Sequence, residues 1–195
     1  MSNLIDLVGR LSASFQRLQL RFAIGGAIAN NYWGVVRTTQ DIDCLIAIPA
    51  IKFQVFADEL TTLGCRFRDA ASQETGITVT EILSQTRNRK FVECFCDNVR
   101  VELFVPAVPL QEEILRRAVT VDLGGYQVPI TTAEDLILVK IAFHRVKDIL
   151  DVRGILWVQR EQLDFDYLRT WSARSLEAQS QAELENLIHT YCVTE

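Results

Sequence analysis

Apolar residues in the first third of the chain recur with two different periods. Alternating steps of four and three residues place one set on a single helical face, which predicts an amphipathic helix over about 3–19: Leu4, Val8, Leu11, Phe15 and Leu18. A short apolar run at about 20–24 predicts a buried strand that ends at Gly25-Gly26. Residues 41–48 predict a second strand, which Pro49 closes. Helices and strands therefore alternate from the start of the chain.

A hairpin is predicted in the middle of the chain. Residues 91–96 and 99–105 alternate around Asp97-Asn98, a dipeptide that tolerates the positive φ of a two-residue turn. In that register Glu93 lies opposite Glu102, and like charges across a hairpin are destabilising. The pair therefore needs a cation, either a metal ion or a nearby basic side chain.

The second half of the chain reads as one more hairpin followed by helices. The hairpin is predicted at 119–123 and 126–130, and Thr131-x-x-Glu134 has the spacing of a capping box for the next helix. Helices beyond the first are predicted at about 27–33, 51–63, 110–118, 136–143, 146–158, 165–176 and 182–191. Residues 65–90 have poor periodicity and receive no assignment.

This order of elements predicts an α+β fold with helices packed on a twisted mixed sheet. We expect residues 1–130 to form the core and residues 131–195 to form a helical C-terminal subdomain.

Composition narrows the classes of function. The chain has 195 residues, 49% of them hydrophobic, which suffices to bury a full core. Its formal net charge of −5 argues against a protein that coats long nucleic acids without specificity. No apolar run approaches the roughly 18 residues of a membrane span, and the first residues lack the basic start of a signal peptide. We expect a cytoplasmic protein that does not bind membranes.

The five cysteines do not form a pattern typical of zinc sites. No CxxC pair is present, and the two histidines, His144 and His189, lie far from the cysteines in sequence. Cys94 and Cys96 share one face of the predicted hairpin, which favours a reduced apolar core over a redox or metal pair. A general-base role for His144 is weaker than a structural role.

Candidate chemistry begins at the glycine pair. Because Gly25-Gly26 follows a predicted strand and lacks side chains, its backbone N–H groups could approach an anion closely, as in a phosphate seat; taken alone, such a pair more often marks a plain turn. Asp41 and Asp43 lie two residues apart, so on a strand both carboxylates leave the same face. Their repulsion calls for a cation, and oxygen ligands suit Mg²⁺.

Other charges extend this candidate site. Arg37 lies just before the aspartates, and Glu102 supplies a third carboxylate from the separately predicted hairpin. Lys140 is the one charge in the apolar stretch 136–143, so it either meets an anion or snorkels to solvent. Together these residues indicate phosphoryl chemistry assisted by two Mg²⁺ ions.

Two further groups of charges have simpler explanations. Asp148 and Asp151 share one helix face, for which a solvated face or salt bridges to Arg145 and Arg153 account at least as well as a substrate contact. The basic run at 87–90 is interpreted as a solvated loop, with a grip on an acceptor RNA as the alternative.

Gly25-Gly26 followed by Arg37-x-Thr39-x-Asp41-Ile42-Asp43 resembles the signature of the polymerase-beta-type nucleotidyltransferase superfamily. The resemblance spans about residues 20–155 and is nearest to the small bacterial abortive-infection and toxin–antitoxin members. It implies a nucleotidyltransferase-like sheet and a C-terminal subdomain that closes the nucleotide cleft.

The resemblance also implies roles for individual residues. Two Mg²⁺ ions would bind Asp41, Asp43 and Glu102, and Lys140 would contact the NTP. The remaining residues assigned to the nucleotide are Gly25, Gly26, Arg37 and Thr39. The third carboxylate is often Asp in these families, and the longer Glu102 leaves room for Glu93 to take part.

The expected reaction moves a nucleoside monophosphate from an NTP to a hydroxyl and releases pyrophosphate, with Glu102 activating the hydroxyl. The acceptor is left open among RNA such as tRNA, a protein and a small molecule, including an antibiotic. The alternative is a catalytically silent nucleotide-binding or toxin–antitoxin module of the same fold, with a cognate antitoxin protein as its partner.

Overall fold

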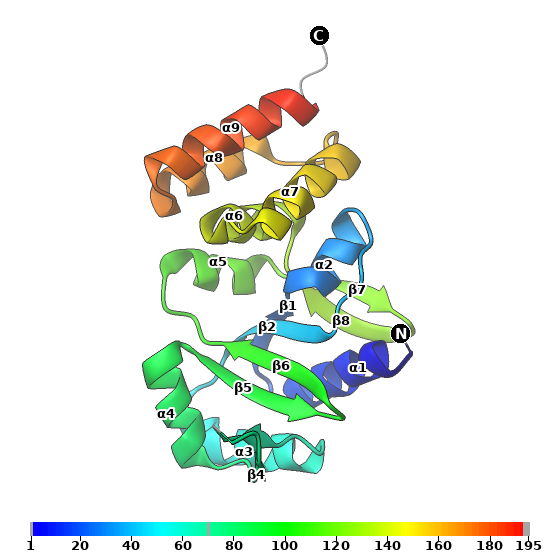
Figure 1. Ribbon diagram of the computed structural model, residues 1–195, viewed down its shortest axis with the longest axis vertical. Helices are drawn as coiled ribbons and strands as arrows, with labels where there is room; N and C mark the ends of the chain where they lie inside the picture. Colours follow the sequence, from blue (N-terminus) through cyan, green and yellow to red (C-terminus); the bar gives the residue numbers. More distant parts are fainter. Residues whose placement is uncertain (1, 70, 193–195) are drawn as a thin grey trace. The chain divides into compact units, whose positions relative to one another are not determined.

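The computed structural model describes residues 2–69 and 71–192, and the chain divides into two compact units (Figure 1). The sheet unit comprises residues 1–25 and 39–130, and the helical unit comprises residues 26–38 and 131–195. The sequence pattern grouped residues 26–38 with the N-terminal part. In the structure these residues pack instead on helices of the C-terminal part.

A six-stranded mixed sheet with the order β5-β6-β2-β1-β8-β7 organises the sheet unit (Figure 1). β2 runs parallel to β6 and β1 runs parallel to β8, whereas the other neighbours are antiparallel. The strands are β1 Arg21–Ile24, β2 Asp41–Ala47, β5 Phe91–Cys96, β6 Val99–Phe104, β7 Val119–Leu123 and β8 Tyr126–Ile130. The predicted mixed sheet and both predicted hairpins are confirmed.

The helices of the sheet unit were predicted from the sequence pattern, except α4, which lies in the segment without an assignment. They are α1 Ser2–Arg17, the 3-10 turn η1 Ala50–Lys52, α3 Phe53–Thr62, α4 Val79–Arg89 and α5 Pro109–Arg117. α1 packs on β1 and β8, and Phe15 lies fully buried near its C-terminal end. The ring of Phe15 contacts those of Phe22 and Phe56, at centroid distances of 5.3 and 5.8 Å. These rings join α1, β1 and α3 into one core.

The segment left unassigned by its poor periodicity contains a small sheet and a helix. β3 Phe67–Arg68 pairs with β4 Glu74–Thr75, and α4 begins after Thr78, whose hydroxyl accepts a hydrogen bond from the Glu81 N–H at 3.2 Å. Arg66 and Phe95 exchange two backbone hydrogen bonds of 2.9 and 2.8 Å, which attach the segment to β5. Such short strands carry too few residues to show a period.

The helical unit consists of α2 Gly26–Trp33, α6 Ala133–Phe143, α7 Val146–Gln159, α8 Phe165–Ser175 and α9 Ala178–Cys192 (Figure 1). No described helix in either unit is long and apolar enough to cross a membrane. His144 ends α6 with a positive φ of 53° and contacts Glu183, which is a structural role.

The capping box predicted at Thr131 and Glu134 is wrong by one residue. Thr132 caps α6: its hydroxyl accepts from the Asp135 N–H at 3.2 Å and donates to the Asp135 carboxylate at 2.9 Å. Glu134 instead accepts a hydrogen bond from the N–H of Asp164, at 3.1 Å. Adjacent threonines followed by adjacent acids offer the same spacing twice, so spacing alone could not choose between them.

The expectation of a reduced cysteine core is wrong for Cys96, which forms a disulfide with Cys65. Because Arg66 pairs with Phe95, residues 65 and 96 lie opposite each other, with Cα atoms 4.3 Å apart. Cys94 keeps a free, buried thiol within 4.8 Å of both bonded sulfurs. Burial raises the pKa of Cys94 to about 12, so this thiol is protonated near neutral pH.

The disulfide should stabilise the sheet unit measurably. It links residues 31 positions apart, and a loop of that length corresponds to about 3–4 kcal/mol in the chain-entropy model. Adding a reductant should therefore lower the free energy of unfolding of the wild type in urea by about that amount. A Cys65→Ser variant is the matched control, and its stability should not respond to the reductant. Equal stability of reduced and oxidised wild type would contradict the expectation.

Candidate functional site

Three acidic side chains lie in one row across three neighbouring strands of the sheet unit. The two-residue turn at Asp97-Asn98 sets Glu93 opposite Glu102, as predicted. The parallel pairing of β2 with β6 then sets Asp43 opposite Glu102 on its other side. Since residues in register share a sheet face, Glu102 lies between Asp43 and Glu93. The structure thus brings together carboxylates that are about 60 residues apart in sequence.

Arg100 is the basic side chain that this row required, and it was not among the residues predicted from the sequence. It lies two residues before Glu102, hence on the same face, and opposite Asp41 in the parallel pair. Its guanidinium donates a hydrogen bond to the Asp41 carboxylate at 2.7 Å. It also lies 3.5 Å from a Glu102 oxygen and 3.8 Å from a Glu93 oxygen. The period-two spacing of Arg100 and Glu102 was the signal available in the sequence.

The surroundings of Glu102 change the protonation of its carboxyl group. Burial raises the pKa of Glu102 to about 7, and a hydrogen bond with Asp43 adds to this effect, while Arg100 opposes it. The pKa of Arg100 is raised chiefly by its hydrogen bond to Asp41. The charge of Arg100 therefore does not cancel the effect of burial on Glu102.

Two residues predicted to bind the nucleotide make hydrogen bonds to the backbone of the aspartate strand. The Thr39 hydroxyl donates to the Asp41 carbonyl at 3.2 Å and accepts from the Asp41 N–H at 3.4 Å. The Gly25 N–H donates to the Asp43 carbonyl at 2.8 Å, so it is not available to an anion. For Gly25 the structure supports a turn at the end of β1. Gly26 begins α2 with a positive φ of 55° and belongs to the helical unit.

Arg37 and Lys140 meet in the helical unit at a buried carboxylate. Arg37 donates two hydrogen bonds to Asp151, at 2.9 and 3.0 Å. Lys140 donates to the same carboxylate at 2.6 Å and lies 3.8 Å from Asp148. Burial would raise the pKa of Asp151, but the hydrogen bonds from Arg37 and Lys140 outweigh it and hold that pKa below its usual range.

The burial of Lys140, Asp148 and Asp151 decides between the alternative interpretations of these side chains. Lys140 does not snorkel, because its side chain is only 5% exposed. Asp148 and Asp151 do not form a solvated face either, since both are buried. Asp148 accepts hydrogen bonds from Arg145, as expected, at 2.6 and 3.2 Å. The exposed residues 87–90 end helix α4 and do not form a loop.

Backbone contacts fix the position of Arg37. Asn31 on α2 accepts a hydrogen bond from the Arg37 N–H at 2.9 Å and donates one to the Arg37 carbonyl at 2.8 Å. Asn31 thus links α2 to the segment that follows it. A side-chain amide that bridges a loop in this way carries no periodic signal in sequence.

Lys140 should be important for folding whether or not it contacts a nucleotide. Lys140→Met keeps the length of the side chain but leaves Asp148 and Asp151 buried without the ammonium. Removing one partner of a buried ion pair costs about 3–5 kcal/mol, and we expect a loss of that size in the free energy of unfolding. Arg169→Met, which removes an exposed ion pair with Glu185 in the same unit, is the control and should cost under about 1 kcal/mol. A cost for Lys140→Met as small as the control's would contradict this account.

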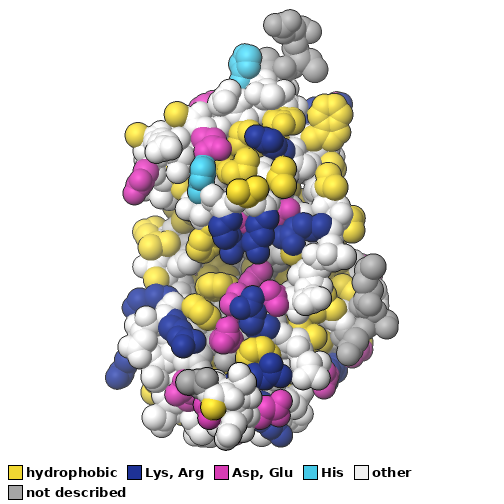
Figure 2. Space-filling model, in the orientation of Figure 1, with side chains coloured by type: hydrophobic (Ala, Val, Ile, Leu, Met, Phe, Trp, Pro, Cys, Tyr) yellow, Lys and Arg dark blue, Asp and Glu magenta, His cyan; other side chains and the backbone are white. Residues whose placement is uncertain are grey.

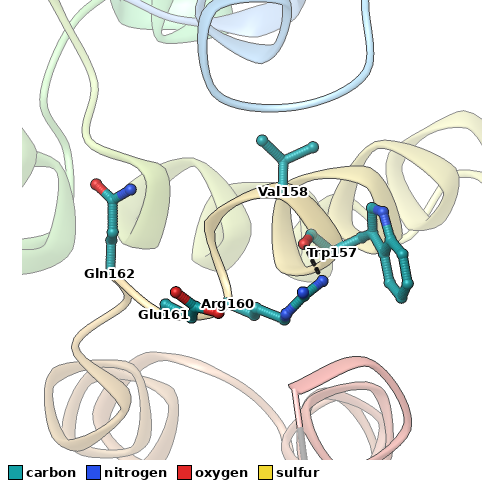
Figure 3. A pocket seen from close by; sticks show the side chains of 5 residues that line it. All are labelled: Trp157, Val158, Arg160, Glu161 and Gln162. Atoms are coloured by element: carbon teal, nitrogen blue, oxygen red, sulfur yellow. Dashed lines mark hydrogen bonds between the residues drawn. The ribbon is translucent and has the colours of Figure 1, made fainter.

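Two hollows among the described residues are lined by side chains other than the predicted site residues. One of about 300 Å³ in the helical unit is lined by the end of α7 and the turn that follows it (Figure 3): Trp157, Val158, Arg160, Glu161 and Gln162. There Arg160 donates to the Trp157 carbonyl at 3.3 Å. On the face shown in Figure 2, acidic and basic side chains lie next to one another. The chemistry is therefore sought in the charged row of the sheet unit.

Comparisons with known proteins give the family of the chain and the likeness of its fold. A family model described as "Nucleotidyl transferase of unknown function (DUF2204)" matches residues 9–187. No curated protein matches the chain.

Solved structures with a similar fold include two of the same antibiotic-resistance factor, ANT(2'')-Ia. Its solution structure is 15% identical in sequence to this chain and superposes with a TM-score of 0.54. The match covers 97% of this chain and 98% of that one. Its crystal structure in complex with adenylyl-2''-tobramycin is 14% identical in sequence to this chain and superposes with a TM-score of 0.55. The match covers 88% of this chain and 96% of that one. At these identities the likeness concerns the fold.

Proposed function

Because the chain belongs to the nucleotidyl transferase family that matches residues 9–187, we propose that it moves a nucleoside monophosphate from an NTP to a hydroxyl acceptor with release of pyrophosphate. We further propose that the reaction depends on Mg²⁺. The observation that carries both proposals is the row of Asp43, Glu102 and Glu93, with Asp41 beside it on the same sheet face.

The donor set fits a hard divalent ion. The side chains in the row offer only carboxylate oxygens, the ligands that Mg²⁺ prefers, and their mutual repulsion would be relieved by a cation. Burial is the main cause of the raised pKa of Glu102, and the charges of Asp43 and Glu93 raise it further. Asp41, Asp43 and Glu102 would hold the metal, with Glu93 at the edge of the set. Mg²⁺ bound there would neutralise part of the negative charge of the triphosphate.

The chain's own groups would position the reactants and move one proton. Glu102, at the centre of the row, is our choice to accept the proton of the attacking hydroxyl. β2 and β6 hold Asp43 and Glu102 in register, so these carboxylates need little reorganisation during the reaction. Thr39 acts indirectly, by fixing the backbone of Asp41. Contacts of Gly26, Arg37 and Lys140 with the nucleotide stay predictions.

For the acceptor we propose a small molecule that carries a hydroxyl group. The support is the shared fold with ANT(2'')-Ia, a protein whose structure contains adenylyl-2''-tobramycin. Transfer to tRNA or to a protein, a cognate antitoxin partner and a cytoplasmic location stay predictions from the sequence.

A specific observation keeps the catalytically silent module as a second candidate. Arg100 already provides a cation to Asp41, and the Gly25 N–H is already bonded to Asp43. A protein that never binds metal would have the same contacts. The two candidates differ in turnover and in what the carboxylates bind.

The test is an assay with each labelled NTP, Mg²⁺ and a panel of aminoglycosides, tRNA and cell protein. We expect labelled product and pyrophosphate from the wild type. Asp43→Asn should lower the rate by about 100-fold or more, because it removes a charge at the reacting centre. Asp58→Asn changes an exposed acid on α3 of the same unit and should leave the rate unchanged. Absence of pyrophosphate with every NTP and acceptor, or equal rates for wild type and Asp43→Asn, would contradict the proposed reaction.

A further inference from the structure

We propose that Arg100 is a built-in counter-ion of the carboxylate row and competes with divalent metal ions for Asp41. The inference rests on the proposed function, because it concerns the same carboxylates. It adds a residue that neither the sequence pattern nor the family match identifies.

The contacts place the guanidinium inside the acidic set. Arg100 donates to Asp41 at 2.7 Å, a short charge-assisted hydrogen bond, while Glu102 and Glu93 lie 3.5 and 3.8 Å away. Its backbone is held on both sides, opposite Asp41 in β2 and opposite Phe95 in β5. Arg100 therefore cannot leave the row by a shift of the strand, and only its side chain can move.

The charge on Arg100 is permanent. A guanidinium does not lose its proton in proteins, and the hydrogen bond to Asp41 raises the pKa of Arg100 further. Any metal cation that binds in the row therefore lies a few ångströms from a fixed positive charge. At such distances the repulsion between like charges near a protein surface is large on the scale of thermal energy.

The competition at Asp41 comes from charge and from space. The hydrogen bond occupies one lone pair of one Asp41 oxygen, and the guanidinium would lie within a few ångströms of any cation that used the remaining lone pairs. The Arg100 side chain is 40% exposed, which gives it solvent-accessible room to swing away. Two outcomes follow: the row is stabilised in the absence of metal, and its metal affinity is lower than the carboxylates alone would provide.

The experiment compares Mn²⁺ binding by the metal-free wild type with that of three variants, using electron paramagnetic resonance to measure free Mn²⁺. Arg100→Gln removes the charge and should bind Mn²⁺ about tenfold more tightly than the wild type. Arg100→Lys keeps the charge and should bind within about twofold of the wild type. Arg116→Gln removes an exposed charge on α5 that pairs with Glu113, away from the row, and should also match the wild type.

A second measurement tests the counter-ion role even where Arg100→Gln is less stable than the wild type. In EDTA the midpoint of thermal unfolding should fall for Arg100→Gln, and saturating Mn²⁺ should raise it by more than it raises that of the wild type. This shift depends on binding to the folded protein and requires no activity.

The outcomes separate this inference from the proposed function. If the wild type binds Mn²⁺ and turns over but Arg100→Gln binds no more tightly, the counter-ion role is overturned and the nucleotidyltransferase proposal stands. If Arg100→Lys binds as tightly as Arg100→Gln, competition by charge is likewise overturned. If neither the wild type nor Arg100→Gln binds Mn²⁺, both proposals fail together.

Discussion

Repulsion among four carboxylates on one sheet face is the constraint around which the sheet unit is arranged. Asp41, Asp43, Glu93 and Glu102 occupy three adjacent strands, and Arg100 is held in register among them. Like charges brought together in this way repel, and either a cation or protonation of one carboxylate relieves the repulsion. The protein supplies one such charge itself, and the proposed Mg²⁺ ions would supply the rest.

In the helical unit, by contrast with the carboxylate row, the buried acids Asp148 and Asp151 are paired with basic side chains. Asp151 receives hydrogen bonds from both Arg37 and Lys140, and Asp148 receives them from Arg145, so these two buried acids are matched by bases. Such a satisfied network fixes the segment after α2 against α6 and α7 and needs no external ion. The contrast explains why we place metal chemistry in the sheet unit, although Arg37 and Lys140 belong to the same family resemblance.

Local sequence patterns predicted many of the helices and both hairpins of this structure. The features that they did not predict depend on pairings between residues far apart in the sequence. The two-residue turn determines the whole register of the β5–β6 hairpin, so the opposition of Glu93 and Glu102 was readable from sequence. The parallel pairing of β2 with β6 joins strands far apart in the chain, and no turn sets its register. The sequence therefore did not indicate that Arg100 lies opposite Asp41. Cys65 lies in a segment without periodicity, so its bond to Cys96 could not be anticipated.

The most direct test of the central claim is a crystal structure of the wild type soaked with Mn²⁺ and a non-hydrolysable NTP analogue, with the metal located by its anomalous scattering. The account predicts an anomalous peak bound by oxygens of Asp41, Asp43 and Glu102, with the Arg100 guanidinium moved off Asp41. An intact Arg100–Asp41 hydrogen bond with no peak at the carboxylate row, or a peak bound only elsewhere, would contradict it.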